Sequence, residues 1–188
     1  IQEIDSVKFD QTPKNNLITF MLVSLDKKKT EKVDVLKPLQ RHLKSSYSEQ
    51  AVTDHQEPLN SFSQLREDVR NSTADRSEQA KDTLMKYYGL LKFVDMRFPI
   101  CESNVRISWT WVDIWRGRKA SHFSSAFERA NVLFNIAAAY SQLGANTNRS
   151  TTEGPKQAAA HFQTSAGALN QLIEYMQAHV DLQSTLPD

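Results

Sequence analysis

The sequence has little of what enzymes, metalloproteins and membrane proteins usually require. Its 188 residues include one cysteine, Cys101, five glycines and five histidines. A single cysteine excludes an internal disulfide and is typical of a reducing compartment. The glycines are isolated, so there is no glycine-rich phosphate loop. No two histidines stand four residues apart, so the sequence predicts neither a metal site nor a cofactor.

Charge excess and long apolar runs are also missing. The formal net charge is +1, whereas dedicated nucleic-acid binders usually carry a strong basic excess, so we expect no nucleic-acid partner. No run approaches the roughly 18–20 apolar residues that a membrane-spanning helix needs. We therefore expect a cytoplasmic protein. Because the first residue is Ile, we also expect the chain to be a piece of a longer protein.

What the sequence does contain is a strong helical pattern over residues 122–144. Ser121 is the predicted N-cap and Gly144 the predicted residue after the helix. Apolar residues on two adjoining faces predict a helix packed on two sides, inside a helical assembly. The main stripe consists of Phe123, Ala126, Phe127, Ala130, Leu133, Phe134, Ala137 and Tyr140.

Further helices are predicted on either side of this central one. They cover residues 33–46, residues 50–71 with a break near Pro58, and residues 78–98 after an N-cap at Ser77. A last long helix begins after Thr151 or Thr152, with Pro155 in its first turn. Its inward stripe is predicted to be Ala158, Phe162, Ser165 or Ala166, Leu169, Ile173, Met176 and Val180.

Strand signals are few. Residues 17–25 are rich in β-branched and large apolar side chains, and residues 105–111 alternate apolar with polar ones. Residues 26–32 are predicted to be a charged turn and residues 112–121 a loop. We therefore predict a mostly α fold, with a tetratricopeptide-like helical hairpin core and a small two-stranded sheet.

No arrangement of side chains predicts catalysis, so we expect the protein not to be an enzyme. Cys101 and His122 are separated by a predicted strand and loop, and nothing supplies the third group of a nucleophilic site. Trp109, Trp111 and Trp115 could form a stacking platform for single-stranded nucleic acid, but packing in the core explains them more simply. An extended helical scaffold of this kind is typical of a partner-binding domain.

A resemblance to a known family rests on ordered motifs. Arg97-Phe98-Pro99 is followed by Ile107-Ser-Trp-Thr-Trp-Val-Asp113, then by Phe127-Glu-Arg-Ala130 and Leu133-Phe-Asn-Ile-Ala137. With Ala160-His-Phe-Gln-Thr-Ser-Ala-Gly-Ala168, these segments resemble the BRO domain of ALIX-type endosomal adaptors. The likeness covers roughly residues 21–181. Residues 21–188 resemble the N-terminal half of that domain, and residues 1–20 are interpreted as a leader or linker.

The resemblance implies a curved helical domain without enzymatic activity. It implies binding to the amphipathic C-terminal helix of ESCRT-III subunits, the charged multivesicular body proteins, with recruitment to endosomal membranes as a peripheral protein. The implied contact residues are Ala158, Ala159 and Phe162. Periodicity instead points Ala158 toward the core, so two interpretations of this residue stand side by side.

Two alternative functions are open at this stage. A signalling scaffold of the rhophilin or fungal pH-response type would keep the same domain between different flanking modules. Direct contact with an anionic membrane surface is a weaker alternative. It would use residues 27–29 or the cationic residues Arg116, Arg118 and Lys119.

Overall fold

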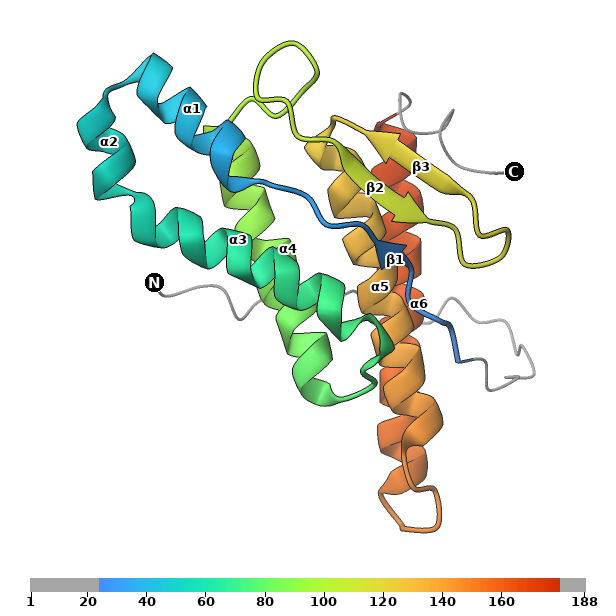
Figure 1. Ribbon diagram of the computed structural model, residues 1–188. Helices are drawn as coiled ribbons and strands as arrows, with labels where there is room; N and C mark the ends of the chain where they lie inside the picture. Colours follow the sequence, from blue (N-terminus) through green and yellow to red (C-terminus); the bar gives the residue numbers. More distant parts are fainter. Residues whose placement is uncertain (1–23, 180–188) are drawn as a thin grey trace.

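The computed structural model describes residues 24–179, which form a mostly helical domain with a small antiparallel sheet (Figure 1). The predicted fold class is confirmed. The helices are α1 (Leu36–Ser46), α2 (Glu49–Asp54), α3 (Gln56–Asn71), the 3-10 turn η1 (Ser72–Ala74), α4 (Glu78–Arg97), α5 (Ser125–Asn146) and α6 (Gly154–Ala178). The strands β1 (Lys29–Thr30), β2 (Trp109–Val112) and β3 (Lys119–His122) are joined in the order β1-β2-β3.

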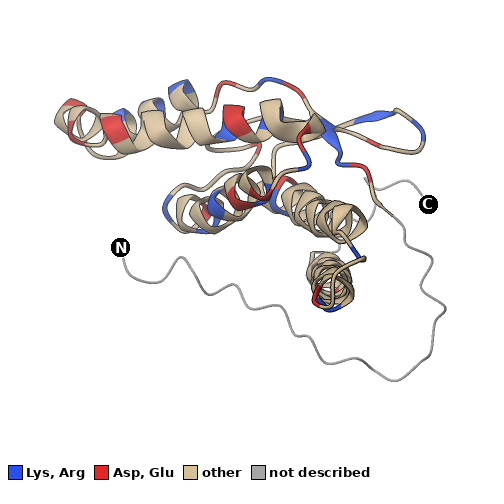
Figure 2. Ribbon diagram, turned by 90° about the horizontal axis from the view of Figure 1, so that it is seen from below, with Lys and Arg blue, Asp and Glu red and all other residues tan. Residues whose placement is uncertain are grey.

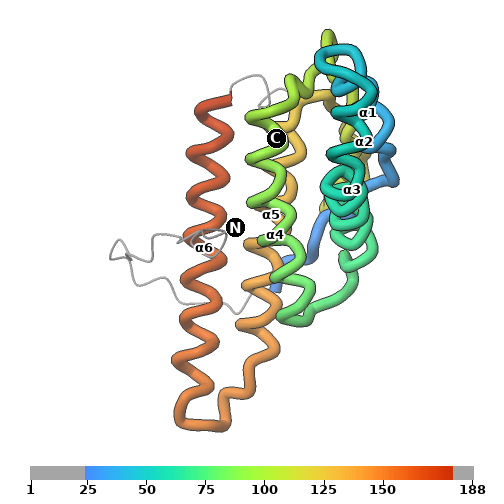
Figure 3. Tube along the Cα trace, turned by 90° about the vertical axis from the view of Figure 1, so that its left-hand side faces the viewer, coloured from blue at the N-terminus to red at the C-terminus, as the bar shows by residue number. Residues whose placement is uncertain are grey.

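Helix α5 is the centre of the domain, as predicted. It contacts α6 on one flank and α4 on the other, and α4 in turn contacts α3 (Figure 3). Val132, Leu133 and Ile136 are fully buried at its middle. Its predicted ends were wrong. Ser121 pairs with Thr110 in the sheet, so Ser124 caps the helix instead, accepting a hydrogen bond from the Ala126 N–H at 3.1 Å.

Gly144 lies inside α5, because the helix continues to Asn146. Its role is a close crossing with α6: a β-carbon at this position would lie 3.1 Å from the Phe162 ring and 3.2 Å from the Ala158 carbonyl oxygen. The Ser165 hydroxyl donates to the Ala137 carbonyl at 2.8 Å and links the two helices again. The predicted helical hairpin is therefore confirmed in α5 and α6 (Figure 1).

The first turn of α6 differs in detail from the prediction. The helix begins at Gly154 and carries Pro155 in its first turn, as expected. Glu153 is the residue before it and provides no side-chain cap. The Thr151 hydroxyl accepts a hydrogen bond from the Gly154 N–H at 3.0 Å. One of the two predicted threonines therefore binds a backbone N–H at the N-terminus of α6 that has no partner within the helix.

The sheet has three strands rather than the predicted two. β1 lies in residues 26–32, predicted to be a turn, and β3 takes in the end of residues 112–121, predicted to be a loop, together with His122, the predicted first residue of the central helix. Of the predicted strand 17–25, residues 17–23 lie outside the described residues, while Ser24 and Leu25 are not in a strand. The predicted strand 105–111 is confirmed in its second half as β2, and its Trp109 and Trp111 are buried in the core as predicted.

Helices α1 to α3 form an arm beside α4 (Figure 1). His55 separates α2 from α3. Pro58 is the third residue of α3, where a backbone N–H would have no partner within the helix, so the proline removes no helical hydrogen bond. The predicted N-cap at Ser77 is confirmed, since its hydroxyl accepts a hydrogen bond from the Ala80 N–H at 3.2 Å. At the start of α1, the Asp34 carboxylate accepts from the Lys37 N–H at 3.2 Å.

A buried ionic cluster joins this arm to α5. The Glu128 carboxylate lies 2.7 Å from the Arg66 Nε, and it accepts hydrogen bonds from the Tyr87 hydroxyl at 2.9 Å and the Trp111 indole N–H at 2.5 Å. Arg66 also donates to the Thr30 hydroxyl at 2.6 Å. Burial raises the pKa of Tyr87, and the neighbouring carboxylate raises it further. One carboxylate thus connects α3, α4, α5 and the sheet.

Candidate functional site

The residues implied as partner contacts lie at the start of α6, but they do not share one environment. Ala158 is only 4% exposed, and its backbone oxygen lies at the close crossing with Gly144. The periodicity interpretation of Ala158 is therefore right, and this side chain offers no surface to a partner. Ala159 is exposed, and Phe162 is half-buried with its ring against α5.

The outer face of α6 carries an apolar stripe. Ala159, Ala166 and Ile173 are all exposed, and Ile173 is 56% exposed. The stripe predicted from the sequence left Ser165 and Ala166 as alternatives, and Ser165 is the buried one. Its Ile173 is wrong, because Ala168 and Leu172 pack toward the core instead, and its Val180 lies outside the described residues. Since residues seven apart lie on one face of a helix, these three side chains share the outer face of α6, with the exposed polar residues Gln163 and Asn170 between them.

Helix α4 also exposes large apolar side chains near its C-terminal end, at Phe93 and Met96. Between α4 and α6, the Arg129 guanidinium lies 5.0 Å from the Tyr175 ring centre and 5.6 Å from that of Tyr88. Burial raises the pKa of Tyr175 to about 12. The cation therefore lies between aromatic rings of the two helices that flank α5.

The predicted anionic-surface contacts lie on the β2–β3 hairpin. Arg116 and Arg118 are exposed in its turn, whereas Lys119 belongs to β3 and forms an ion pair with Glu31. Trp115, in the same turn, is 73% exposed, so the prediction of a core position fails for this tryptophan. Elsewhere, charges of both signs are interspersed along α1 to α4, while α5 and α6 are mostly uncharged (Figure 2).

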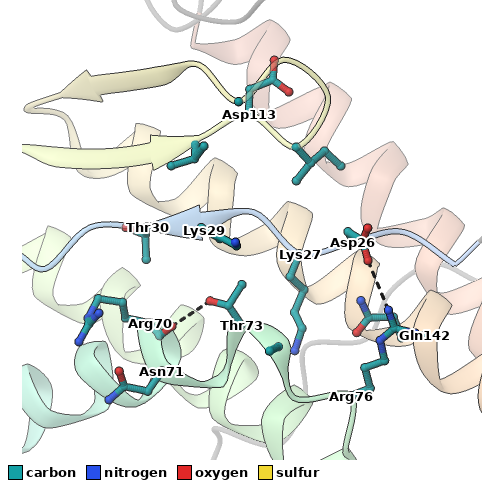
Figure 4. A pocket seen from close by; sticks show the side chains of 14 residues that line it. Asp26, Lys27, Lys29, Thr30, Arg70, Asn71, Thr73, Arg76, Asp113 and Gln142 are labelled. Carbon is teal, nitrogen blue, oxygen red and sulfur yellow. Dashed lines mark hydrogen bonds and ion pairs between the residues drawn. The ribbon is translucent and has the colours of Figure 1, made fainter.

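A second surface feature was missed by sequence reasoning: a polar cleft of about 700 Å³ beneath the hairpin, between β1, η1 and α5 (Figure 4). Its deepest polar side chains are Lys27, 5% exposed, and Gln142, 2% exposed. The Lys27 ammonium donates to the Ser72 carbonyl at 3.1 Å and to the Asp75 carbonyl. Burial lowers the pKa of Lys27.

Polar side chains of α5 form hydrogen bonds with the backbone of the segment 25–28, which lines this cleft. Asn135 accepts from the Lys28 N–H at 2.7 Å and donates to the Lys28 carbonyl at 2.9 Å. Ser141 accepts from the Leu25 N–H at 2.9 Å, and Gln142 donates to the Leu25 carbonyl at 2.7 Å. The asparagine of the Leu133-Phe-Asn motif was a sequence signal for this contact, but its partner lies about a hundred residues away.

The groups considered for catalysis are engaged in local structure. Cys101 lies 3.3 Å from the Ser103 hydroxyl, and this hydrogen bond lowers the pKa of the thiol. The His122 ring accepts from the Ser124 N–H at 3.0 Å. Between residues 24 and 179, no cluster of His, Cys, Asp and Glu is suited to a metal ion, and no helix has the length and apolarity to cross a membrane.

Comparisons with known proteins agree with these features. Residues 22–186 match the BRO1-like domain family. The chain is 44% identical over 158 residues to ALG-2 interacting protein X of Dictyostelium discoideum, covering 84% of this chain and 20% of the relative. It is 35% identical over 153 residues to Rhophilin-2-B of Xenopus laevis, covering 81% and 22% respectively.

A solved structure, the ALIX BRO1 CHMP4C complex, is also similar. It superposes with a TM-score of 0.75 at 30% identity, covering 88% of this chain and 47% of the solved one. The chain thus spans about a fifth of the length of these two curated relatives and about half of the solved domain. The motif resemblance and the fold agree with this result, and the chain belongs to the BRO1-like domain family.

Proposed function

We propose that this domain is a non-enzymatic adaptor module that docks the amphipathic C-terminal helix of an ESCRT-III subunit on the outer face of α6. The observation that carries the proposal is the uncovered apolar stripe of Ala159, Ala166 and Ile173. It is supported by the similarity to an ALIX BRO1 domain whose solved structure is a complex with CHMP4C. Helix-in-groove binding uses apolar anchors at this spacing.

The proposal extends to the place and context of action. A domain of this kind would act in the cytoplasm and be recruited to endosomes as a peripheral protein by its ESCRT-III partner. Because the chain covers 47% of the solved domain, we interpret residues 21–188 as its N-terminal half, preceded by a leader or linker at residues 1–20. Phe162, half-buried beside Ala159, would form the edge of the contact.

The test is a titration of the 188-residue chain with a labelled C-terminal helix peptide of a charged multivesicular body protein. We expect saturable binding that Ala159→Glu or Ile173→Glu weakens about tenfold or more, because a carboxylate would be desolvated against an apolar helix. Ser61→Glu, at an exposed position of α3, is the control and should bind unchanged. Absence of saturable binding to any such peptide would remove the proposal.

A signalling scaffold is the second candidate, favoured by the 35% identity to Rhophilin-2-B. The flanking sequence of the longer protein would separate the two: a Rho-binding coiled coil or PDZ module indicates a rhophilin-type scaffold. A coiled V-shaped region with a proline-rich tail indicates an ALIX-type adaptor.

Contact with an anionic membrane is a third candidate, favoured by exposed Trp115 beside Arg116 and Arg118 on the hairpin. Tryptophan at a lipid interface and basic residues near anionic lipid both favour binding. Neutralising Arg116, Arg118 and Lys119 should then abolish co-sedimentation with phosphatidylserine vesicles. Unchanged co-sedimentation would exclude this function.

A further inference from the structure

The outer face of α6 differs from the surface of α4 by its lack of charge. Residues 157–173 contain no Lys, Arg, Asp or Glu, although these residue types make up 24% of the chain (Figure 2). Helix α4, which also flanks α5, exposes charged side chains along its length, at Glu78, Asp82, Lys86, Lys92 and Arg97. Depletion of charged residues is typical of the core of a protein–protein interface.

An apolar seam runs along this uncharged stretch. Three exposed residues, Ala159, Ala166 and Ile173, are each followed three positions later by a half-buried apolar residue. Those half-buried residues are Phe162, Leu169 and Met176. Alternating steps of three and four residues form the pattern by which one helix packs against a second one. Because two of the exposed residues are alanines, the second helix can approach closely.

The seam is complementary to itself in size when a second copy runs antiparallel to it. Ala159 and Ile173 each stand seven residues from Ala166, on opposite sides of it. A two-fold axis at Ala166 therefore places the large Ile173 of one copy opposite the small Ala159 of the other, twice in each pair. A large side chain facing a small one is the arrangement that close packing favours.

The same arrangement is complementary in charge. Lys156 and Glu174 are separated by five helical turns, so they lie on one line of the helix surface, at nearly equal distances before and after Ala166. Lys156 is 3.2 Å from Glu153, but both side chains are largely exposed, so this ion pair is weak and exchangeable. Glu174 is exposed and forms no ion pair with any residue between 24 and 179. In an antiparallel pair, each lysine would face the glutamate of the other copy.

We propose that the outer face of α6 binds the same face of a second copy of this chain, as an antiparallel helix pair centred on Ala166. An anionic lipid surface fits less well, because Glu174 would repel it. Self-association would also cover the face proposed to dock an ESCRT-III helix, so the two occupants compete. This competition rests on the proposed function, whereas the dimer itself does not.

Sedimentation equilibrium of the 188-residue chain tests the pairing. A single helix pair buries less area than a standard interface, so the expected Kd of the dimer is on the order of 100 μM. Glu174→Lys and Lys156→Glu should each raise this Kd about tenfold or more, because each change creates two like-charge contacts in the dimer. A mixture of the two variants should associate again, since opposite charges then face each other. Association in the mixture also shows that both variants are folded.

A control separates this face from general charge effects. Glu57→Lys makes the same charge change as Glu174→Lys on an exposed part of α3 and should leave the Kd of the dimer unchanged. Equal loss in these two variants, no association in the mixture, or a monomer at all concentrations up to ~1 mM overturns the proposal. The peptide titration is a separate measurement. Peptide binding by a chain that stays monomeric removes only the dimer, and a dimer that binds no peptide removes only the proposed docking function.

Discussion

Two polar regions meet helix α5, and they are built in opposite ways. Near its start, Glu128 is completely buried and both oxygens of its carboxylate have partners, in Arg66, Tyr87 and Trp111, although the Arg66 Nη1 is itself buried without a hydrogen-bond partner among the described residues. Near its end, Gln142 is nearly as buried, yet its Oε1 has no hydrogen-bond partner among the described residues. Burial of a polar side chain therefore does not show whether its acceptor atoms have hydrogen-bond partners: those of Glu128 have them, and the Gln142 Oε1 has none among the described residues.

The largest effect should come from breaking the closed region. Glu128→Gln keeps the shape of the side chain but leaves the Arg66 guanidinium buried without a counter-charge. We expect a loss of about 3–5 kcal/mol in the free energy of unfolding, measured by urea denaturation followed by circular dichroism.

The double variant Arg66→Met/Glu128→Gln is the matched control. Because it removes the unpaired charge as well, it should be more stable than Glu128→Gln alone. A cost below about 1 kcal/mol for Glu128→Gln would show that water reaches this cluster and that the two regions are not opposites.

Asn135→Ala should have the next largest effect. Asn135 makes two hydrogen bonds to the backbone of Lys28, and both are lost. At about 1 kcal/mol for each bond, the expected loss is about 2 kcal/mol. Asn146→Ala, at the exposed last residue of the same helix, should change stability by less than about 0.5 kcal/mol. Equal losses in the two variants would contradict the anchoring role.

Gln142→Met sharpens the comparison further. Only the bond to the Leu25 carbonyl is lost, because the Oε1 atom has no described partner. The same denaturation measurement should give a loss of about 1 kcal/mol, below that of Asn135→Ala. A loss as large as that of Glu128→Gln would mean that this end of α5 is also a closed region.

The smallest effect on stability should come from Lys29→Gln. The side chain is exposed and forms no ion pair with the residues between 24 and 179, so the free energy of unfolding should change by less than about 0.5 kcal/mol. Destabilisation beyond 1 kcal/mol would assign Lys29 to the fold instead.

Periodicity predicted the long helices because each one buries a stripe of its own residues. α4, α5 and α6 all lie close to their predicted ranges. The strands β1 and β3 could not be predicted in this way, since their sequences, Lys-Thr and Lys-Ala-Ser-His, have no apolar alternation. They are strands because β2, buried through Trp109 and Trp111, offers a backbone ladder on both sides.

The candidate sites were less predictable than the helices. An apolar pattern identifies positions that need covering, but it cannot tell which neighbour covers them, so Ile173 was placed inward although it is exposed. Gln142 and Lys27 were missed for the opposite reason. Both are polar residues that the apolar pattern does not place in the core. Their burial depends on contacts between distant parts of the chain, which the pattern does not show.

The attachment of the segment 25–28 to α5 has a consequence for the order of folding. Its partners Asn131, Asn135, Ser141 and Gln142 lie 103 to 117 residues further along the chain. During synthesis this segment is made early but has nothing to bind until α5 has emerged and formed. Contacts of such large sequence separation form slowly, because a long loop must close first. Strand β1 should therefore join the sheet late, and hydrogen exchange at the Lys28 amide should be protected only after that of the α5 core.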